Sequence, residues 1–390
     1  MRLLFRLTAI LFIVLPTVSI GRAQTNVTGC VEDYQPGVDY FPARAEVEYA
    51  DGFAVEYFDN YKVVEVLTPW AGADETYTYV LVQCGTPAPE GFDDATVVEV
   101  PVESIVVMST TYLPPLVELD LLDTLVAVDE HDFVYSPEVR KRIDAGDVIE
   151  VGGGTLVNVE QVLNLDADLI MTYGIGSPDY DAHPALINAG LDVVLNADYM
   201  ETSPLGRAEW LKFMALFYNR EADANALFDE IVGNYEALSA LSEAVEARPQ
   251  VMVNAMFGDT WYAAGGSSYI ARLIADAGGD YVWADDESTG ALALSFEAAY
   301  DRAQDADVWL NPNFWFTLEE GLAEDERYGE FDAFANGQVY NSNAQVTPLG
   351  GNNSGELGAM RPDITLADLI AIFHPELLPD HDLVFYRRLE

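Results

Sequence analysis

The residues in this sequence that could do chemistry are mostly aromatic and small polar ones, gathered in the loops that follow apolar, strand-like segments. Rings and hydroxyl groups in such loops bind a small ligand by stacking and hydrogen bonding. The competing interpretation of any single ring is core packing, which we assign to Trp309 because it lies inside an apolar strand. We expect the ligand-binding set to comprise Ser109, Thr110, Tyr112, Phe133, Tyr135, Gly174, Tyr199, Trp261, Tyr262, Trp283, Trp315 and Arg361, the last being the cation that we place near these loops.

Known catalytic motifs do not fit the sequence. It contains no G-x-S-x-G elbow, and Gly265-Gly-Ser-Ser268 lacks the second glycine, so a serine hydrolase has no positioned nucleophile. Gly174-Ile-Gly176 lacks the third glycine of a dinucleotide-binding fingerprint, and we interpret its glycines as a tight turn. We therefore expect a protein that is not an enzyme and needs no cofactor, with a two-lobed extracellular enzyme as the less favoured alternative.

The four histidines, His131, His183, His374 and His381, lack the spacing of a zinc site. A site for a divalent metal ion needs at least three converging ligands. His131 and His183 could form such a site together with Glu201. We expect no metal site, but a protein that binds Zn²⁺ or Mn²⁺ in the same architecture stays open as an alternative.

The loops must be positioned by strands that alternate with helices along most of the chain. Strands are predicted in a first region at 104–108, 125–128, 169–173 and 192–195, and in a second region at 250–257, 308–310 and 339–340. Short apolar strands separated by helices imply parallel sheets covered on both faces. Such sheets bind ligands beyond the carboxyl ends of their strands, so two facing sheets would place the loops around one cleft.

A long helix is predicted between the two regions, from Glu221 to Val245. Apolar residues recur there at spacings of three and four, with Asn219 as the predicted N-cap. Its 25 residues would span about 37 Å, roughly the width of a domain. We interpret it as a rigid connector that allows only a modest hinge, with Gly233 as its one weak point.

The two regions share a repeated unit, in which a Glu opens a short helix that ends in Asp-Ala-Asp before a buried strand. The first copy runs from Glu160 to Asp168 and the second from Glu297 to Asp307. Glu160 and Glu297 should therefore occupy equivalent places in two copies of one half-fold.

The N-terminal region indicates export. Residues 1–23 have the basic start, apolar run and small-residue end of a signal peptide; a membrane anchor is the rival reading. Val27-Thr28-Gly29-Cys30 resembles a lipidation signal but lies nine residues beyond that run. We favour a disulfide between the two cysteines, Cys30 and Cys84, which lipidation of Cys30 would exclude.

An alternating pattern from Ala45 to Val82 predicts a small antiparallel sheet, to which we assign a structural role. The formal net charge of −48 repels phosphate backbones, which excludes nucleic acid as a partner. We interpret the charge as a solvated acidic surface.

Together these features resemble the solute-binding proteins of ATP-binding-cassette (ABC) importers for ferric siderophores and cobalamin. The resemblance is carried by Val106-Val-Met-Ser-Thr-Thr-Tyr112, by the two repeated units, by Trp261-Tyr-Ala-Ala-Gly-Gly-Ser-Ser-Tyr269 and by Arg361-Pro-Asp-Ile-Thr-Leu-Ala-Asp-Leu369. It covers roughly Val97 to the end of the chain. Where the family usually has Lys-Pro-Asp before the strand, this chain has Asp-Ala-Asp.

The resemblance implies an α/β fold of two Rossmann-like lobes joined by one long helix, to which the alternating pattern adds a small N-terminal antiparallel β extension. The corresponding domains are a signal peptide (1–23), the β extension and connector (24–102), an N-terminal lobe (103–206), a helical segment (207–247) and a C-terminal lobe (248–390).

In function, the resemblance implies an extracytoplasmic, monomeric protein that captures an iron chelate or a corrinoid and delivers it to an ABC permease dimer. In this family one surface Glu of each lobe docks on the permease, and Glu160 and Glu297 match those positions; the competing interpretation is that each only caps its helix. The scarcity of basic residues near the cleft argues against a highly anionic ligand such as ferric citrate.

Overall fold

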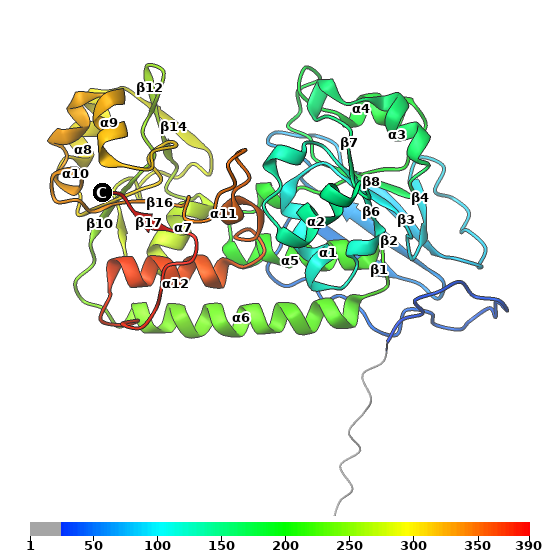
Figure 1. Cartoon of the computed structure of the whole chain (residues 1–390). Coiled ribbons are helices and arrows are strands. Elements are labelled where there is room, and N and C mark those ends of the chain that lie inside the picture. Colours follow the sequence, from blue (N-terminus) through cyan, green and yellow to red (C-terminus); the bar gives the residue numbers. More distant parts are fainter. Residues whose placement is uncertain (1–24) are drawn as a thin grey trace, which may run out of the picture.

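The computed structural model describes residues 25–390, which form two α/β lobes connected by one long helix (Figure 1). The predicted signal peptide, 1–23, and its rival membrane anchor lie outside the described residues. Across residues 25–390, no helix has both the length and the apolar character that crossing a membrane requires.

Lobe one is built on a five-stranded sheet in which every pairing is parallel. The strand order is β7 (Ile149–Glu150), β6 (Leu125–Val128), β5 (Ile105–Val107), β8 (Leu169–Thr172) and β9 (Val193–Leu195). The connecting helices are α1 (Leu113–Glu118), α2 (Pro137–Ala145), α3 (Val159–Leu165) and α4 (His183–Asn188). The predicted strands and their parallel arrangement are confirmed, with small differences at their ends.

Lobe two repeats this plan with one strand reversed. Its main sheet has the order β13 (Asp280–Tyr281), β10 (Gln250–Val253), β15 (Val308–Leu310), β16 (Val339–Asn341) and β17 (Arg387–Arg388), and only β17 runs antiparallel to its neighbour. Its helices are α7 (Tyr269–Asp276), α8 (Phe296–Ala303), α9 (Leu318–Glu324), α10 (Asp332–Ala335), α11 (Asn353–Glu356) and α12 (Pro362–Phe373).

A second, antiparallel sheet in lobe two was not expected from the sequence. It contains β11 (Met256–Phe257), β12 (Thr260–Ala264) and β14 (Ala291–Leu294). The prediction of one strand over 250–257 is wrong because Asn254 adopts a left-handed conformation, with φ 62°, which ends β10 before β11 begins.

The second Asp of the repeated unit has the same role in both lobes. Asp168 Oδ2 accepts hydrogen bonds from the backbone N–H groups of Glu103 (2.8 Å) and Ser104 (2.9 Å), just before β5. Asp307 Oδ2 likewise accepts from the backbone N–H of Gln250 (2.8 Å), at the start of β10. The sequence repeat therefore corresponds to a repeated structural feature, in which a carboxylate fixes the start of the neighbouring strand.

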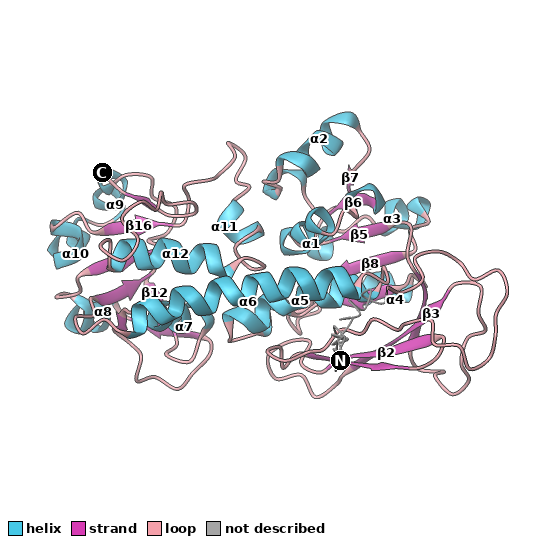
Figure 2. Ribbon diagram, turned by 90° about the horizontal axis from the view of Figure 1, so that it is seen from below, coloured by secondary structure: helices cyan, strands magenta, loops and turns pink. Residues whose placement is uncertain are grey.

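The connecting helix is α6 (Glu221–Glu243), with α5 (Pro204–Leu216) and α12 packed against it (Figure 2). The helix is continuous through Gly233 and ends two residues earlier than predicted. The N-cap prediction is wrong: Arg220 occupies that position and makes no side-chain capping bond. Asn219 instead adopts φ 58° and donates from Nδ2 to Gln83 Oε1 (2.8 Å) in the N-terminal sheet.

The N-terminal sheet contains β1 (Phe53–Tyr57), β2 (Tyr61–Val66), β3 (Tyr77–Gln83) and β4 (Thr96–Val100). Strands β1 to β3 are antiparallel as predicted, whereas β4 pairs with β3 in parallel. A disulfide joins Cys30 to Cys84, directly after β3.

Two buried lysines attach this sheet and the segment before it to the rest of the molecule. Lys62 of β2 donates to Glu221 Oε1 (2.8 Å) at the start of α6, and both side chains are 0% exposed. Lys212 of α5 donates to Glu209 Oε1 (2.8 Å) and to the backbone oxygen of Glu46 (2.6 Å). The chain has only three lysines, and two of them are used at this one junction.

Candidate ligand-binding cleft

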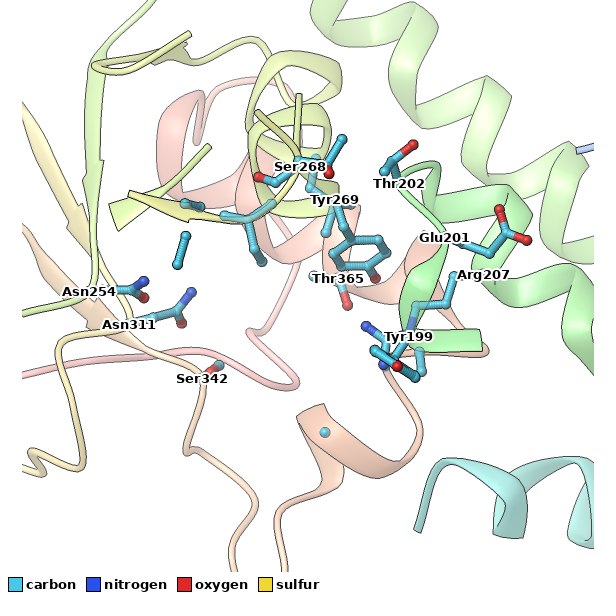
Figure 3. A pocket seen from close by; sticks show the side chains of 18 of the residues that line it. Tyr199, Glu201, Thr202, Arg207, Asn254, Ser268, Tyr269, Asn311, Ser342 and Thr365 are labelled. Atoms are coloured by element: carbon cyan, nitrogen blue, oxygen red, sulfur yellow. The ribbon is translucent and has the colours of Figure 1, made fainter. Parts of the chain in front are cut away.

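A cavity of about 660 Å³ opens between the two lobes, within the usual size range of small-molecule sites. Figure 3 shows Asn254, Asn311 and Ser342 on one side, Tyr199 and Arg207 on the other, and the ring of Tyr269 between them. The lining combines phenol rings, side-chain amides and hydroxyls, with Arg207 as a cationic group. The cavity can therefore hold a bulky ligand that presents several hydrogen-bonding groups and a limited negative charge.

Arg207 is the best-placed cation in this cavity. Its guanidinium lies over the Tyr269 ring of lobe two, 5.3 Å from the ring centroid, and its Nε is 3.9 Å from Asp198 Oδ2. Nε has no hydrogen-bond partner among the described residues. Nε itself is buried, so what Arg207 gives the cavity lining is a positive charge.

The local sequence explains how Arg207 is presented. Ser203 caps α5 by accepting a hydrogen bond from the backbone N–H of Gly206 (3.2 Å), and Pro204 occupies the first helical position. Arg207 lies in the first turn of this helix, close to the positive end of the helix dipole. A guanidinium and a helix N-terminus on the same side of the cavity both favour a negatively charged group on the ligand.

Burial favours the neutral form of two cleft tyrosines, Tyr199 and Tyr269. Burial raises the pKa of the Tyr199 phenol to about 12, with nearby Asp181 adding to the shift. Burial also raises the pKa of Tyr269, against the lowering effect of Arg207. The Tyr199 hydroxyl already donates to the backbone oxygen of Gly174 (2.6 Å), so Tyr199 offers the cavity its ring, and neither phenol acts as an anionic ligand.

Asn254 and Asn311 occupy equivalent places in the cleft, directly after β10 and β15. Both adopt left-handed backbone conformations (φ 62° and 56°), which asparagine tolerates better than most residues. Asn254 Nδ2 donates to the backbone oxygen of Tyr262 (2.7 Å), and Asn311 Nδ2 donates to Tyr386 Oη (3.3 Å). Asn311 Oδ1 is buried and has no hydrogen-bond partner among the described residues.

Of the predicted ligand-binding residues, Tyr199 and Tyr262 line the cavity. Four predicted aromatics are buried in the core instead: Tyr112, Trp261, Trp283 and Trp315 are each no more than 3% exposed. Trp261 packs against the ring of Trp309 and donates from Nε1 to the backbone oxygen of Val253 (3.1 Å). For these four residues, the core interpretation is correct and the cleft prediction is wrong.

The remaining predicted residues lie outside the cavity lining. Ser109 Oγ bonds to Thr111 Oγ1 (3.0 Å), and Thr110 is half-buried beside it. Gly174 is covered by the ring of Trp70. Arg361 is paired with Asp363 (2.7 Å), so Arg207 rather than Arg361 is the cleft cation. Phe133 and Tyr135 belong to a contact between the lobes.

The alternative metal site is not assembled. His131 Nε2 lies 3.2 Å from the backbone oxygen of Val148, and the His183 ring stacks on Trp70. The Glu201 carboxylate accepts from the backbone N–H of Gly52 (2.8 Å) and from Trp210 Nε1 (3.0 Å). Within residues 25–390, the one cluster of three potential metal-ligating groups is Cys30, Cys84 and Glu99, whose cysteines form the disulfide.

A loop of lobe two contacts lobe one directly at α11, which lies between the lobes in Figure 1. Glu356, which is 1% exposed, accepts hydrogen bonds from the backbone N–H groups of Tyr135 (2.7 Å) and Ser136 (3.0 Å). Gly351 approaches so closely that a Cβ would lie 2.7 Å from the backbone oxygen of Val134. The contact therefore depends on one carboxyl group and one glycine.

This contact should weaken as the pH rises. Burial raises the pKa of Glu356 from 4.5 to about 7, with Glu138 adding to the shift and the two backbone hydrogen bonds opposing it. A carboxyl whose pKa is raised in the contact stabilises it fully below 4.5, and that stabilisation is lost as the pH rises through 7. We expect small-angle scattering to give a larger radius of gyration at about pH 8 than at about pH 5. The Glu356→Gln variant should show no such difference, and an unchanged radius in the wild type would contradict the prediction.

Sequence reasoning missed Arg207, Asn254, Asn311 and Tyr269 as cleft residues. A usable signal existed for the two asparagines, because each stands directly after an apolar strand. For Arg207 the signal was weaker: an Arg in the first turn of a helix with a Ser-Pro start, in a chain with few basic residues. Tyr269 enters the sequence analysis only as the last residue of the Trp261–Tyr269 stretch that carries the family resemblance.

Comparisons with known proteins agree with this architecture. The family model described as periplasmic binding protein matches residues 105–346. An uncharacterized lipoprotein of Methanocaldococcus jannaschii is 28% identical over 307 residues, which cover 75% of this chain and 70% of that protein.

Two solved structures illustrate the shared fold. The periplasmic heme-binding protein RhuT from Roseiflexus, in apo form, has a TM-score of 0.54 at 20% identity, and the match covers 70% of this chain and 99% of that chain. A structure from Saccharomonospora viridis, described as an ABC-type Fe³⁺-hydroxamate transport system, has a TM-score of 0.54 at 17% identity, covering 70% and 94% of the respective chains.

Proposed function

This chain belongs to the periplasmic binding protein family, and from that premise we propose that it captures a ferric chelate between its lobes and delivers it to an ABC importer. It is thus an extracytoplasmic binding protein rather than an enzyme. The observation that carries the proposal is the interlobe cavity, in which Arg207 of α5 faces Tyr269 of lobe two. Because both lobes supply lining residues, a bound ligand would hold the lobes in one relative orientation.

The chemistry of the lining favours a chelate of low net charge. Neutral phenols and amides bind the oxygens and the organic backbone of a chelate, and Arg207 binds one anionic oxygen. A ligand as anionic as ferric citrate would need more cations than this lining offers. A hydroxamate chelate is therefore our first choice, and the two solved structures named above, whose descriptions mention heme and Fe³⁺-hydroxamate, support an iron-containing ligand. A corrinoid is the second choice.

A binding screen on the purified protein tests this proposal. Ferrioxamine B, haemin, cyanocobalamin, ferric citrate, Zn²⁺ and Mn²⁺ would each be added during thermal unfolding. A ligand at a hundred times its dissociation constant should stabilise the protein by about 2.7 kcal/mol. Stabilisation by ferrioxamine B or haemin supports the proposal. Stabilisation by the free metal ions alone would favour the divalent-metal alternative, and no response to any chelate or corrinoid would overturn the proposal.

The two glutamates of the repeated unit are our candidates for docking on the permease. Glu160 and Glu297 are each the second residue of their helix, after the caps Asn158 and Ser295, and both are exposed. Glu297 pairs only loosely with Arg327, at 3.7 Å. Equivalent positions in two similar lobes suit a two-fold symmetric partner.

We expect the double variant Glu160→Arg, Glu297→Arg to keep its ligand affinity and to lose uptake, because the reversed charges would repel a cationic docking surface. Uptake of labelled chelate by cells that carry the importer measures the second effect, and calorimetry measures the first. Exchanging the exposed acids Glu319 and Asp301 for Arg provides a control with the same change in net charge. If the double variant lost ligand binding, the two glutamates would have a structural role instead.

A further inference from the structure

The loop between β2 and β3, residues 67–76, lies outside the stretch matched by the family model and reaches the ligand cavity. At its tip, the backbone N–H of Ala73 donates to the backbone oxygen of Trp70 (3.2 Å), and Gly72 has φ 76°. A turn of this kind needs a positive φ at its third residue, which glycine supplies without strain. The turn presents Ala71, an exposed residue, to the cavity as part of its lining.

Trp70 holds this turn against lobe one. Its ring stacks on the His183 ring, with 5.5 Å between centroids, and lies edge-on to Tyr77. Gly174 and Gly176 make room for it, since a Cβ at either position would lie within 3.0 Å of the indole. These glycines follow β8, so the carboxyl edge of the lobe-one sheet is shaped to receive a side chain from the N-terminal extension.

Tyr199 connects the loop to the cavity wall. Its hydroxyl donates to the backbone oxygen of Gly174 (2.6 Å) and lies 3.5 Å from the backbone oxygen of Pro69, while its ring lines the cavity. Glu201, also in the lining, accepts from the backbone N–H of Gly52 in the extension (2.8 Å). The extension is thus bonded to two cavity residues and supplies a third, Ala71.

We propose that the N-terminal extension is part of the ligand-binding site, with Ala71 as a residue that selects ligands by size and Trp70 as the residue that positions it. This inference rests on the proposed function, because the ligand is taken to be a chelate that fills the interlobe cavity. A small residue at the tip leaves space at the rim for the periphery of a chelate. A larger side chain at position 71 would occupy that space.

Calorimetry on the full chain tests the role of Ala71, with ferrioxamine B, haemin and cyanocobalamin as probes. For each probe that the wild type binds, Ala71→Trp should raise the dissociation constant about ten-fold or more. Thr68→Trp is the matched control, because Thr68 is exposed on the same loop and outside the cavity lining, and it should bind as the wild type does. Unchanged affinity of Ala71→Trp, with a normal melting temperature, overturns the inference while leaving the proposed function intact. If the wild type binds none of the probes, both fail.

The positioning role of Trp70 has its own readout. Trp70→Ala should weaken binding, and Trp70→Phe should restore most of the affinity because a phenyl ring can still stack on His183. A purely structural residue would lower the melting temperature without changing the dissociation constant of the folded protein, and that result would overturn the positioning role. If Trp70→Ala does not fold, the Phe variant and Ala71→Trp still decide the question.

Discussion

Replacing Lys62 with methionine is expected to lower the free energy of unfolding by about 3–5 kcal/mol, because it leaves a buried carboxylate without its partner. Lys62 Nζ donates to Glu221 Oε1 and Asn219 Oδ1 (2.9 Å) and to the backbone oxygen of Leu216, and desolvation by burial lowers its pKa. Removing the ammonium group would strip three acceptors of their donor inside the junction between the N-terminal sheet and α6. Chemical denaturation, followed by circular dichroism, measures the loss.

The third lysine provides the control. Lys141 is exposed on α2, so Lys141→Met removes the same charge and should change the free energy of unfolding by less than about 0.5 kcal/mol. The double variant Lys62→Met, Glu221→Gln should recover part of the loss, because it no longer buries an unpaired charge. A loss of less than about 1 kcal/mol for Lys62→Met, which is the size of a surface ion-pair effect, would contradict the burial of this ion pair.

Replacing Arg207 with glutamine is expected to weaken chelate binding by about ten- to a hundred-fold, the value of one or two charge-assisted hydrogen bonds. The guanidinium is the cation that the cavity presents at the junction of the two lobes, and its Nε, 3.9 Å from Asp198 Oδ2, has no hydrogen-bond partner among the described residues. Burial raises the pKa of Asp198, which is 6% exposed, and the loss of Arg207 would remove the positive charge that opposes this rise. Calorimetry at neutral pH with the chelate that the wild type binds measures the change in affinity.

Arg361→Gln separates this effect from a general loss of positive charge. Arg361 is paired with Asp363 and lies outside the cavity lining, so its removal should leave the affinity within about two-fold of the wild type. Equal effects of the two substitutions, or no effect of Arg207→Gln on a protein that still binds the chelate, would show that Arg207 does not contact the ligand.

The sequence identified the elements of the fold because their signals are local. The spacing of apolar residues predicted α6, and short apolar segments between helices predicted the two parallel sheets; both are confirmed. The repeated Glu-helix-Asp unit also depends on neighbouring residues alone, and Asp168 and Asp307 occupy matching places. Local patterns fail where a side chain finds a distant partner. Asn219 satisfied the rule for an N-cap, but it bonds to Lys62 and Gln83 of the N-terminal sheet.

Tertiary structure determines which residues line the cleft. Trp261 and Tyr262 are neighbours on β12, and the alternation of a strand requires them to face opposite sides. Trp261 is 0% exposed because it packs against the rings of Trp309, Tyr328 and Phe331, whereas Tyr262 is 43% exposed and lines the cavity. Arg207 and Ala71 reach the same cavity from α5 and from the N-terminal sheet. The sequence alone determined which elements form, because each depends on nearby residues; which side chains face the ligand depends on contacts between residues far apart in the chain, and these exist only in the folded molecule.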